Sequence, residues 1–289
     1  IIEKIDELRE LAPVHNHGHA LALWACRKIL PNVPQVVVFD TAFHQTIPQK
    51  AFMYGFPYED YEQFHVRKYG FHGTSHRFVT AKLAEIMGKD LKDLKVVSCH
   101  LGNGSSITAV QDGKSVDTTM GFTPLDGVLM GTRCGAVDPS AVTYVAGKHG
   151  FGVSEMDTYM NKKSGMLALS GVSSDFRDLE NAHKEGNERA GLAVDMFNYG
   201  VKKLIGAYAA AMGGVDAIIF TAGVGENDAL ERMQIASGLE YMGVKMDEDA
   251  NNVRGEERVI SATDSKVKVL LIPTNEELMI AMDTASLVG

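Results

Sequence analysis

The sequence predicts an α/β fold, in which helices cover both faces of a mixed sheet. Three observations support this prediction. Short β-branched runs alternate with longer helical patterns. The clearest runs are almost wholly apolar, as in strands buried on both faces, and each is followed by a polar or glycine-rich turn. These strands are expected at residues 36–39, 96–99, 217–220 and 267–272.

A helix is predicted at the start of the chain. Apolar residues from Ile1 to Ala12 recur with helical spacing, and Pro13 is expected to end the helix. Because the helix is already under way at Ile1, we expect the chain to begin inside a longer protein.

Two further helices and a meander are predicted in the rest of the chain. One helix runs from a cap at Thr74 or Ser75 to Gly88, and a long buried helix covers about 187–212. Residues 96–119 read as three antiparallel strands joined by turns that are rich in glycine, Asn and Asp.

The composition argues against some classes of binding partner. The 289 residues include 28 Lys and Arg against 37 Asp and Glu, a formal net charge of −9, which argues against binding to nucleic acid or to an anionic membrane. No apolar run approaches the roughly 18 residues of a membrane span. Three cysteines without a C-x-x-C pair favour reduced thiols. We therefore expect a cytoplasmic protein.

Residues 100–106, His-Leu-Gly-Asn-Gly-Ser-Ser, form the first candidate phosphate site. Two glycines let the backbone approach a phosphate and turn its N–H groups toward it, and the hydroxyls add donors. The same letters also suit an ordinary hairpin that needs positive φ, so both interpretations stay open.

Residues 221–227, Thr-Ala-Gly-Val-Gly-Glu-Asn, form a second glycine cluster between a strand and a helical run from about Asp228. A nucleotide can lie against free amides and the positive end of a helix in this context. The cluster lacks the Walker lysine and the third glycine of the dinucleotide fingerprint, so a tight βα turn is the alternative.

Acidic residues follow two of the predicted strands. Asp40 comes after residues 36–39, and Glu276 with Glu277 comes after residues 267–272. Carboxylates at strand ends suit a hard cation such as magnesium, which neutralises phosphate charge. Taken singly, each is more often a helix cap or first-turn acid, but two of them in a chain with glycine phosphate loops favour metal.

Arginine and histidine side chains are candidates for binding an anionic substrate. Arg133 lies among small residues, which leaves its guanidinium room to reach a phosphoryl group. His72, flanked by glycine at a helix start, reads as a hydrogen-bond donor to an anionic substrate, whereas His76 reads as structural. His15, His17 and His19 are interpreted as a polar turn, with metal chelation as the minority alternative.

Taken together, these motifs resemble the acetate kinase family, within the superfamily of sugar kinases, heat-shock ATPases and actin. The resemblance covers essentially the whole chain. It is carried by residues 38–46 (Val-Phe-Asp-Thr-Ala-Phe-His-Gln-Thr), 70–76, 99–106, 120–125, 131–133, 170–178, 220–227 and 273–280. It implies an actin-like ATPase domain with a ribonuclease H-like mixed sheet at residues 43–276, and the remnant of a second such domain at 1–42 and 277–289.

The resemblance also implies roles for individual residues. Asp40 and Glu276 would organise Mg²⁺, with Mn²⁺ as an alternative ion, while His72 and Arg133 would hold the transferring phosphoryl group. Val14, Phe71 and Pro124 would line the pocket for the methyl group of the acid. ATP or ADP would be bound by His100, Leu101, Gly102, Asn103, Gly104, Asp175, Phe176, Arg177, Gly223, Val224, Gly225, Glu226 and Asn227.

The activity implied is reversible, in-line transfer of a phosphoryl group from ATP to acetate, giving acetyl phosphate and ADP, by a homodimer. A propionate or other short-chain fatty acid kinase is one alternative, because one methylene in an apolar pocket is worth only about 1 to 3 kcal/mol. The other alternative is a truncated nucleotide-binding chain without turnover.

The chain departs from the family pattern in three places. The family's N-terminal domain carries a serine-rich phosphate loop and a second substrate arginine, and neither motif occurs after Ile1. His17 stands where the family usually has proline. Ala136 stands where it usually has an acid that could orient Arg133.

Overall fold

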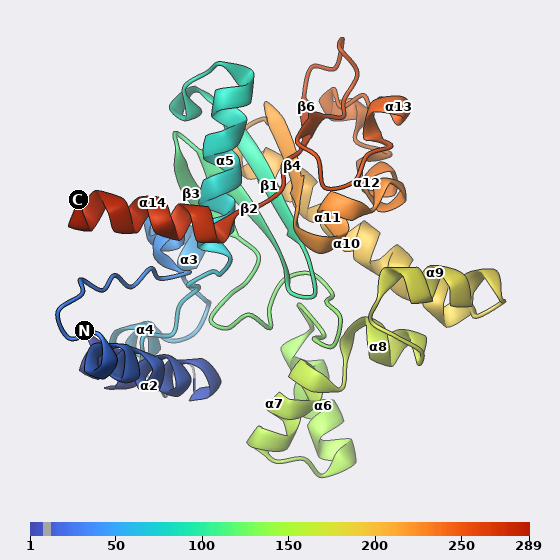
Figure 1. Cartoon of the computed structure of the whole chain (residues 1–289). Helices are drawn as coiled ribbons and strands as arrows, with labels where there is room; N and C mark the ends of the chain where they lie inside the picture. The colour runs from blue at the N-terminus through green and yellow to red at the C-terminus, as the bar shows by residue number, and fades with distance from the viewer. Residues whose placement is uncertain (8–12) are drawn as a thin grey trace. The chain divides into compact units, whose positions relative to one another are not determined.

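The computed structural model describes residues 1–7 and 13–289. These divide into two compact units (Figure 1). The first unit comprises Ile1–Phe39 together with Glu277–Gly289, and the second comprises Asp40–Glu276.

The first unit is built from helices. Helix α1 (Ile2–Glu7) packs against α2 (Pro13–Ile29), and α14 (Glu276–Val288) supplies the C-terminal part. Pro13 is the first described residue of α2 and itself lies in a helix. Of the predicted helix from Ile1 to Ala12, residues 2–7 form α1 and residues 8–12 lie outside the described residues, so its end at Pro13 stays a prediction.

The alternating histidines do not form the expected polar turn. His15, His17 and His19 all lie in α2. The Nδ1 atom of His17 lies 3.6 Å from Oδ1 of Asp6 on α1. The expected polar turn at His15–His19 is therefore a helix.

Residues 36–39 do not form the predicted strand. A strand needs a neighbour to pair its backbone N–H and C=O groups, and none of the ladders formed by the described residues includes this segment. Phe39 is half exposed, so the apolar run is not a buried strand here.

The second unit contains a six-stranded mixed sheet with strand order β3-β2-β1-β4-β6-β5. The β1–β2, β2–β3 and β5–β6 pairs are antiparallel, and β4 is parallel to both β1 and β6. The predicted meander and three of the four predicted strands are confirmed. The strands are β1 (Lys95–Leu101), β2 (Ser105–Gln111), β3 (Lys114–Thr118), β4 (Ala217–Thr221), β5 (Arg258–Val259) and β6 (Lys268–Leu271).

The sheet is covered on both faces, as its apolar strands predict. Along β1, Val97 and Cys99 pack in the core cluster that includes Phe197 of α10 (Glu188–Met212). Val96 instead packs with Leu83 of α5 (Gly73–Met87). This alternation is the two-residue period of a strand, and it places α10 and α5 on opposite faces (Figure 1).

Both helices end as their glycines predict, since Gly88 and Gly213 adopt the left-handed conformation at the C-caps. Asn187 caps α10 by accepting from the Ala190 N–H. The expected cap of α5 at Thr74 or Ser75 is wrong: its N-cap is His72, whose φ of 55° is unusual for a residue other than glycine.

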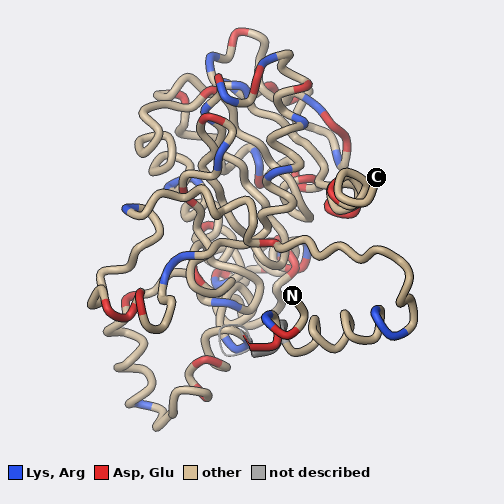
Figure 2. The backbone as a smooth tube through the Cα atoms, turned by 90° about the vertical axis from the view of Figure 1, so that its left-hand side faces the viewer, with Lys and Arg blue, Asp and Glu red and all other residues tan. Residues whose placement is uncertain are grey.

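The remaining helices connect these layers. They are η2 (Ala42–Thr46), α3 (Gln49–Phe52), α4 (Tyr58–Phe64), η3 (Leu91–Asp93), α6 (Pro139–His149), α7 (Val153–Lys162), α8 (Gly165–Ser170), α9 (Phe176–Lys184), α11 (Ala222–Asn227), α12 (Ala229–Ala236), η4 (Glu240–Met242) and α13 (Glu248–Asn251). Within the second unit, acidic and basic residues are interspersed along the backbone (Figure 2). Among the helices of the described chain, none is both long and apolar enough to cross a membrane.

Candidate functional site

The carboxyl ends of the parallel strands gather the candidate residues. His100, near the end of β1, pairs with Thr221 at the end of β4, and Phe220 pairs with Leu271 at the end of β6. The glycine turn after β1, helix α11 after β4 and the segment that leads to Glu276 after β6 therefore leave the sheet at one edge. Open α/β sheets bind ligands at this edge.

The turn between β1 and β2 is a hairpin that also faces a cavity. The Gly102 N–H donates to the Gly104 carbonyl (3.1 Å), and the Ser105 hydroxyl donates to the Gly102 carbonyl (2.9 Å). The Asn103 carbonyl accepts from the Gly131 N–H (3.4 Å), which ties the turn to the loop that carries Arg133. The hairpin is confirmed, but the expected positive φ is wrong, because none of residues 102–104 adopts it. The phosphate-loop interpretation stays a prediction.

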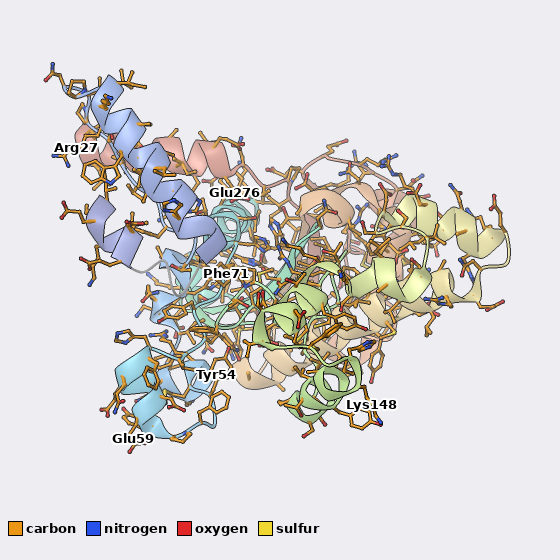
Figure 3. The ribbon with its side chains drawn as sticks, turned by 90° about the horizontal axis from the view of Figure 1, so that it is seen from below. Arg27, Tyr54, Glu59, Phe71, Lys148 and Glu276 are labelled. Atoms are coloured by element: carbon orange, nitrogen blue, oxygen red, sulfur yellow. The ribbon has the colours of Figure 1, made fainter. Side chains whose placement is uncertain are left out.

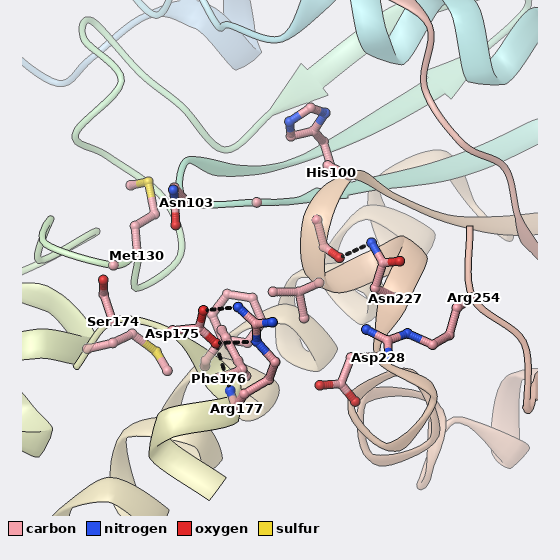
Figure 4. Close-up of a pocket in the computed structure, with 17 residues that line it drawn as sticks. His100, Asn103, Met130, Ser174, Asp175, Phe176, Arg177, Asn227, Asp228 and Arg254 are labelled. Atoms are coloured by element: carbon pink, nitrogen blue, oxygen red, sulfur yellow. Dashed lines mark hydrogen bonds and ion pairs between the residues drawn. The ribbon is translucent and has the colours of Figure 1, made fainter. Parts of the chain in front are cut away.

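A cavity of about 550 Å³ lies beside this turn (Figure 4). Sequence reasoning predicted nine of its lining residues: His100, Gly102, Asn103, Asp175, Phe176, Arg177, Gly223, Val224 and Asn227. The residues that the resemblance assigns to ATP do not include the other eight: Met130, Gly131, Met166, Ser174, Phe197, Ala222, Asp228 and Arg254. Ala222 nevertheless lies within the predicted 221–227 cluster. No sequence pattern identified Arg254 as a site residue, because it lies in an irregular segment without a glycine motif.

Asp175 and Arg177, both in the lining of this cavity, form an ion pair. Arg177 donates to Asp175 from Nε (3.0 Å) and Nη2 (2.6 Å), and Asp175 also caps α9 by accepting from the Arg177 N–H (2.9 Å). This interaction lowers the pKa of Asp175 and raises that of Arg177. Phe176 packs edge-to-face against Phe197, with ring centroids 5.0 Å apart.

Four residues of the expected nucleotide set are not among the lining residues: Leu101, Gly104, Gly225 and Glu226. Leu101 is fully buried in the core. The Glu226 Oε1 atom accepts from the Ala222 N–H (2.7 Å), the Thr221 hydroxyl (3.2 Å) and the Thr274 N–H (3.0 Å). Its carboxylate therefore caps α11 and links it to the segment before Glu276.

The glycine cluster is not the expected turn. Residues 222–227 are already helical, as α11, and Asp228 caps the next helix, α12. Ala222 has a φ of 63°, so the chain enters α11 through a left-handed residue. The Glu226 carboxylate supplies the acceptor that this helix start needs.

A second group of candidates surrounds His72. The His72 N–H donates to Asp40 Oδ2 (2.7 Å), and the Gly73 N–H donates to the Asp40 carbonyl (2.8 Å). A methyl group on Gly73 would lie 2.3 Å from that carbonyl oxygen, so glycine is required for this approach. The start of α5 is thereby held against Asp40, which accounts for the left-handed backbone of His72.

The His72 ring faces Gly104 and Arg133. A methyl group on Gly104 would lie 3.4 Å from both His72 Nε2 and Arg133 Nη1. Burial is the largest cause that lowers the pKa of His72, to about 4; Asp40 raises it, and Arg133 lowers it further. Two side chains that can donate hydrogen bonds to an anion, the Arg133 cation and the neutral His72 ring, therefore face the same glycine.

Arg133 also contacts the expected acid pocket. Its Nη1 atom donates to the Pro124 carbonyl (3.2 Å), and partial burial lowers its pKa. Tyr54 supports the same loop, since its hydroxyl accepts from the Phe122 N–H (2.8 Å); Tyr54 and Phe71 are labelled in Figure 3. Phe71 directly precedes His72, whereas the side chain of Val14 lies outside the described residues.

The candidate metal ligands are Asp40 and Glu276. Glu276 begins α14 and is the last residue of the second unit (Figure 3). Within the described part of the chain, no three His, Cys, Asp or Glu side chains gather to hold a metal ion by themselves. Mg²⁺ is commonly held by one or two carboxylates, with water and substrate phosphates completing its shell, so a magnesium site needs no larger cluster of protein ligands.

Comparisons with known proteins agree with this geometry. The model of the acetokinase family matches residues 1–282. The chain is 56% identical to acetate kinase 2 of Clostridium perfringens over 289 residues, which is all of this chain and 73% of that protein. It is 58% identical to an acetate kinase of Alkaliphilus metalliredigens over 284 residues, or 98% of this chain and 72% of that protein.

Solved structures give the same result. The acetate kinase of Porphyromonas gingivalis superposes with a TM-score of 0.97 at 47% identity, covering 100% of this chain and 72% of that one. A propionate kinase from Francisella tularensis superposes with a TM-score of 0.92 at 43% identity, covering 99% and 73%. The mixed sheet thus has the actin-like ATPase fold of these kinases, and the chain belongs to the acetokinase family.

Proposed function

We propose that this chain transfers the γ-phosphoryl group of ATP to the carboxylate of acetate, reversibly, and releases acetyl phosphate and ADP. The observation that carries the proposal is the convergence of His72 and Arg133 on Gly104, beside a cavity lined by His100 and Asn103. Membership of the acetokinase family supports this activity.

The cavity is assigned to the nucleotide. Asp175, Phe176 and Arg177 form one wall, and residues of α11 form another. The turn residues His100 to Gly104 lead from this cavity to His72, so the phosphates of a nucleotide bound here extend toward the transferring centre. Glu226 supports the second wall, because its carboxylate accepts from the Ala222 N–H at the start of α11.

Transfer itself needs positioning and charge neutralisation. A carboxylate oxygen of acetate bonds to the γ-phosphorus while the bond to the bridging oxygen of ADP breaks. Arg133 supplies a fixed positive charge to the phosphoryl oxygens. The His72 ring, uncharged at neutral pH, is assigned as a hydrogen-bond donor to the same oxygens, and Asp40 fixes the His72 backbone.

Phe71 and Pro124, with Val14, are assigned to the methyl group of acetate. A propionate kinase is among the similar structures, and an added methylene changes binding by only about 1 to 3 kcal/mol. We assign acetate as the preferred acid and propionate as a poorer one.

Asp40 and Glu276 are assigned to Mg²⁺, or to Mn²⁺ in its place. The ion would neutralise charge on the ATP phosphates. We also assign the first unit to the remnant of a second actin-like domain, and the second unit to a complete one. A homodimer in the cytoplasm completes the proposal, and the three free cysteines support that compartment.

An acyl-phosphate assay on this chain tests the proposal. We expect hydroxamate-trapped acetyl phosphate at saturating Mg-ATP and acetate, with a higher kcat/KM for acetate than for propionate. ATP binding by calorimetry without product would instead support the nucleotide-binding alternative. A higher kcat/KM for propionate would overturn the choice of acid. Arg133→Ala serves as the matched control for contaminating kinase activity.

A further inference from the structure

A chain of buried hydrogen bonds runs from the core to the His72 ring. Ser98 Oγ lies 2.8 Å from His76 Nδ1, and His76 Nε2 lies 2.8 Å from Ser106 Oγ. Ser106 Oγ in turn lies 2.9 Å from His72 Nδ1. Ser98, His76 and Ser106 are fully buried, so water does not compete for these contacts.

Rigid elements hold the four residues. His72 and His76 lie one turn apart at the start of α5, Ser98 lies on β1, and Ser106 lies on β2. In the ladder, Ser106 pairs with His100, whose ring stacks on that of His72. Such a framework can fix the direction of each hydrogen bond.

When both histidine rings are neutral, the number of protons allows two arrangements of these hydrogen bonds. The Ser106 hydroxyl has one hydrogen, so it donates to one histidine and accepts from the other. In the first arrangement Ser98 donates to His76, His76 donates from Nε2 to Ser106, and Ser106 donates to His72 Nδ1. The proton of His72 then lies on Nε2. In the second arrangement every bond is reversed, and Nε2 of His72 carries a lone pair.

The surroundings of His72 Nε2 favour the first arrangement. This atom and the Arg133 guanidinium both lie 3.4 Å from the position of a methyl group on Gly104. An arginine offers only donors, so the shared space suits an anionic oxygen. A lone pair at Nε2 would repel that oxygen, whereas an N–H donates to it.

We propose that Ser106 is a positioning residue that keeps the proton of His72 on Nε2, and that His76 and Ser98 fix the direction of the Ser106 hydroxyl. The catalytic consequence rests on the proposed role of His72 at the phosphoryl group. The tautomer itself does not depend on that role. His76 is fully buried and the His72 ring lies beside the Arg133 guanidinium, so neither place favours a second, charged proton, and each ring has a single proton to place.

The direct test is the nitrogen NMR spectrum of the full chain labelled with ¹⁵N-histidine, with His72→Gln and His76→Gln used for assignment. We expect protonated Nε2 and unprotonated Nδ1 in both rings. His44 is an internal reference, because its Nε2 lies 2.9 Å from the Phe71 carbonyl, which can only accept. A protonated Nδ1 on His72 overturns the proposal, whatever the activity.

Ser106→Ala tests the consequence. We expect His72 to become a mixture of tautomers and kcat to fall about 10- to 100-fold, with the Kd for ATP nearly unchanged. The matched control is Thr108→Val, two residues along β2, which removes a buried hydroxyl whose hydrogen bond goes to Thr118 and not to a histidine. Unchanged tautomer and kcat in Ser106→Ala, or an equal loss in Thr108→Val, would overturn the positioning role.

The proposed function and the proposed direction of the hydrogen bonds can be disproved independently. If the wild-type chain makes no acyl phosphate but His72 shows the Nε2 proton, the proposed function fails and the hydrogen-bond direction stands. If the chain is active and His72 carries its proton on Nδ1, the relay fails and the function stands. The wild-type spectrum decides the tautomer even if Ser106→Ala does not fold.

Discussion

The imidazole rings of His72 and His100 are stacked, with centroids 4.0 Å apart and planes 18° from parallel. A positive charge on both rings would place two like charges in contact inside a buried cluster. Burial lowers the pKa of His72, to about 4, and also the pKa values of His44, His76 and His100. The folded cluster is therefore uncharged at neutral pH.

This cluster predicts a loss of stability in mild acid. An unfolded histidine has a pKa of about 6.5, so between that pH and the lower folded pKa the unfolded chain binds more protons. The stabilisation is complete above about pH 6.5 and is lost as the pH falls. Each such histidine adds about 1.4 kcal/mol per pH unit to the slope.

Urea unfolding measured from pH 7.5 down to pH 5 checks this prediction. Repeating the series at high salt is the control, because salt screens exposed charges far more than buried ones. A free energy of unfolding that stays constant or rises as the pH falls below 6.5 would contradict it.

Replacement of Arg133 by alanine should lower turnover far more than nucleotide affinity. Arg133 faces the His72 side of Gly104 and does not line the nucleotide cavity, so its charge acts on the phosphoryl group in flight. By analogy with arginine fingers, kcat should fall about 10³-fold or more. The measurement is kcat together with the Kd for ATP by calorimetry.

Arg177→Ala is the matched comparison for Arg133→Ala. Arg177 lines the cavity and pairs with Asp175, so its removal should raise the Kd for ATP more than it lowers kcat. If the two variants show the same pattern, the division between nucleotide binding and transfer is wrong.

Gly104→Ala should leave the fold intact and block transfer. The added methyl group makes ordinary contacts of 3.4 Å with His72 and Arg133, so the free energy of unfolding should change by less than about 1 kcal/mol. It fills the space between the two donors, and a displacement of about 1 Å in the reacting group can cost about 10²-fold in rate. Thermal unfolding of the variant checks the expected stability, and its kcat checks the expected loss of transfer.

The control for Gly104→Ala is Gly147→Ala in α6, where a methyl group meets nothing within 4 Å. That variant should keep full activity. Normal turnover in Gly104→Ala would show that the phosphoryl group does not pass between His72 and Arg133.

Much of the second unit could be predicted from local pattern. The apolar spacing of α5 and α10, the stop at Gly213 and the meander after Lys95 are properties of short segments, and the structure confirms them. Residues 36–39 have a strand-like composition but no ladder partner among the described residues. Composition cannot supply that partner, so this prediction failed.

The site was harder to predict where its contacts are long-range. His72 and Ser106 are 34 positions apart, and His76 and Ser98 are 22 apart. Helical spacing related His72 to His76, but only the packing of α5 on β1 and β2 shows what lies between them. Gly223 and Gly225 predicted a turn, but the segment is helical. The acceptor at the start of α11 is the carboxylate of Glu226, which lies inside the helix itself.

Glu226 gives the last prediction, which separates support of the nucleotide site from contact with the nucleotide. Its Oε1 atom accepts from two backbone N–H groups, of Ala222 and Thr274, and thus joins α11 to the segment before Glu276. Glu226→Ala leaves both donors without this acceptor, and because the two hydrogen bonds are only partly buried the cost should be about 1 kcal/mol for each. We expect a lower free energy of unfolding and a weaker affinity for ATP, because Gly223 and Val224 of α11 line the cavity.

Glu226→Gln discriminates between the two explanations, because its amide oxygen can still accept from both N–H groups. It should keep most of the stability and most of the ATP affinity if the carboxylate acts by holding α11. Glu85→Ala, which removes an exposed acid paired with Lys82 on α5, is the control for loss of charge and should change neither quantity appreciably. Urea unfolding and calorimetry on the three variants check the prediction. Loss of ATP affinity in Glu226→Gln without loss of stability would mean that the carboxylate acts on the nucleotide directly.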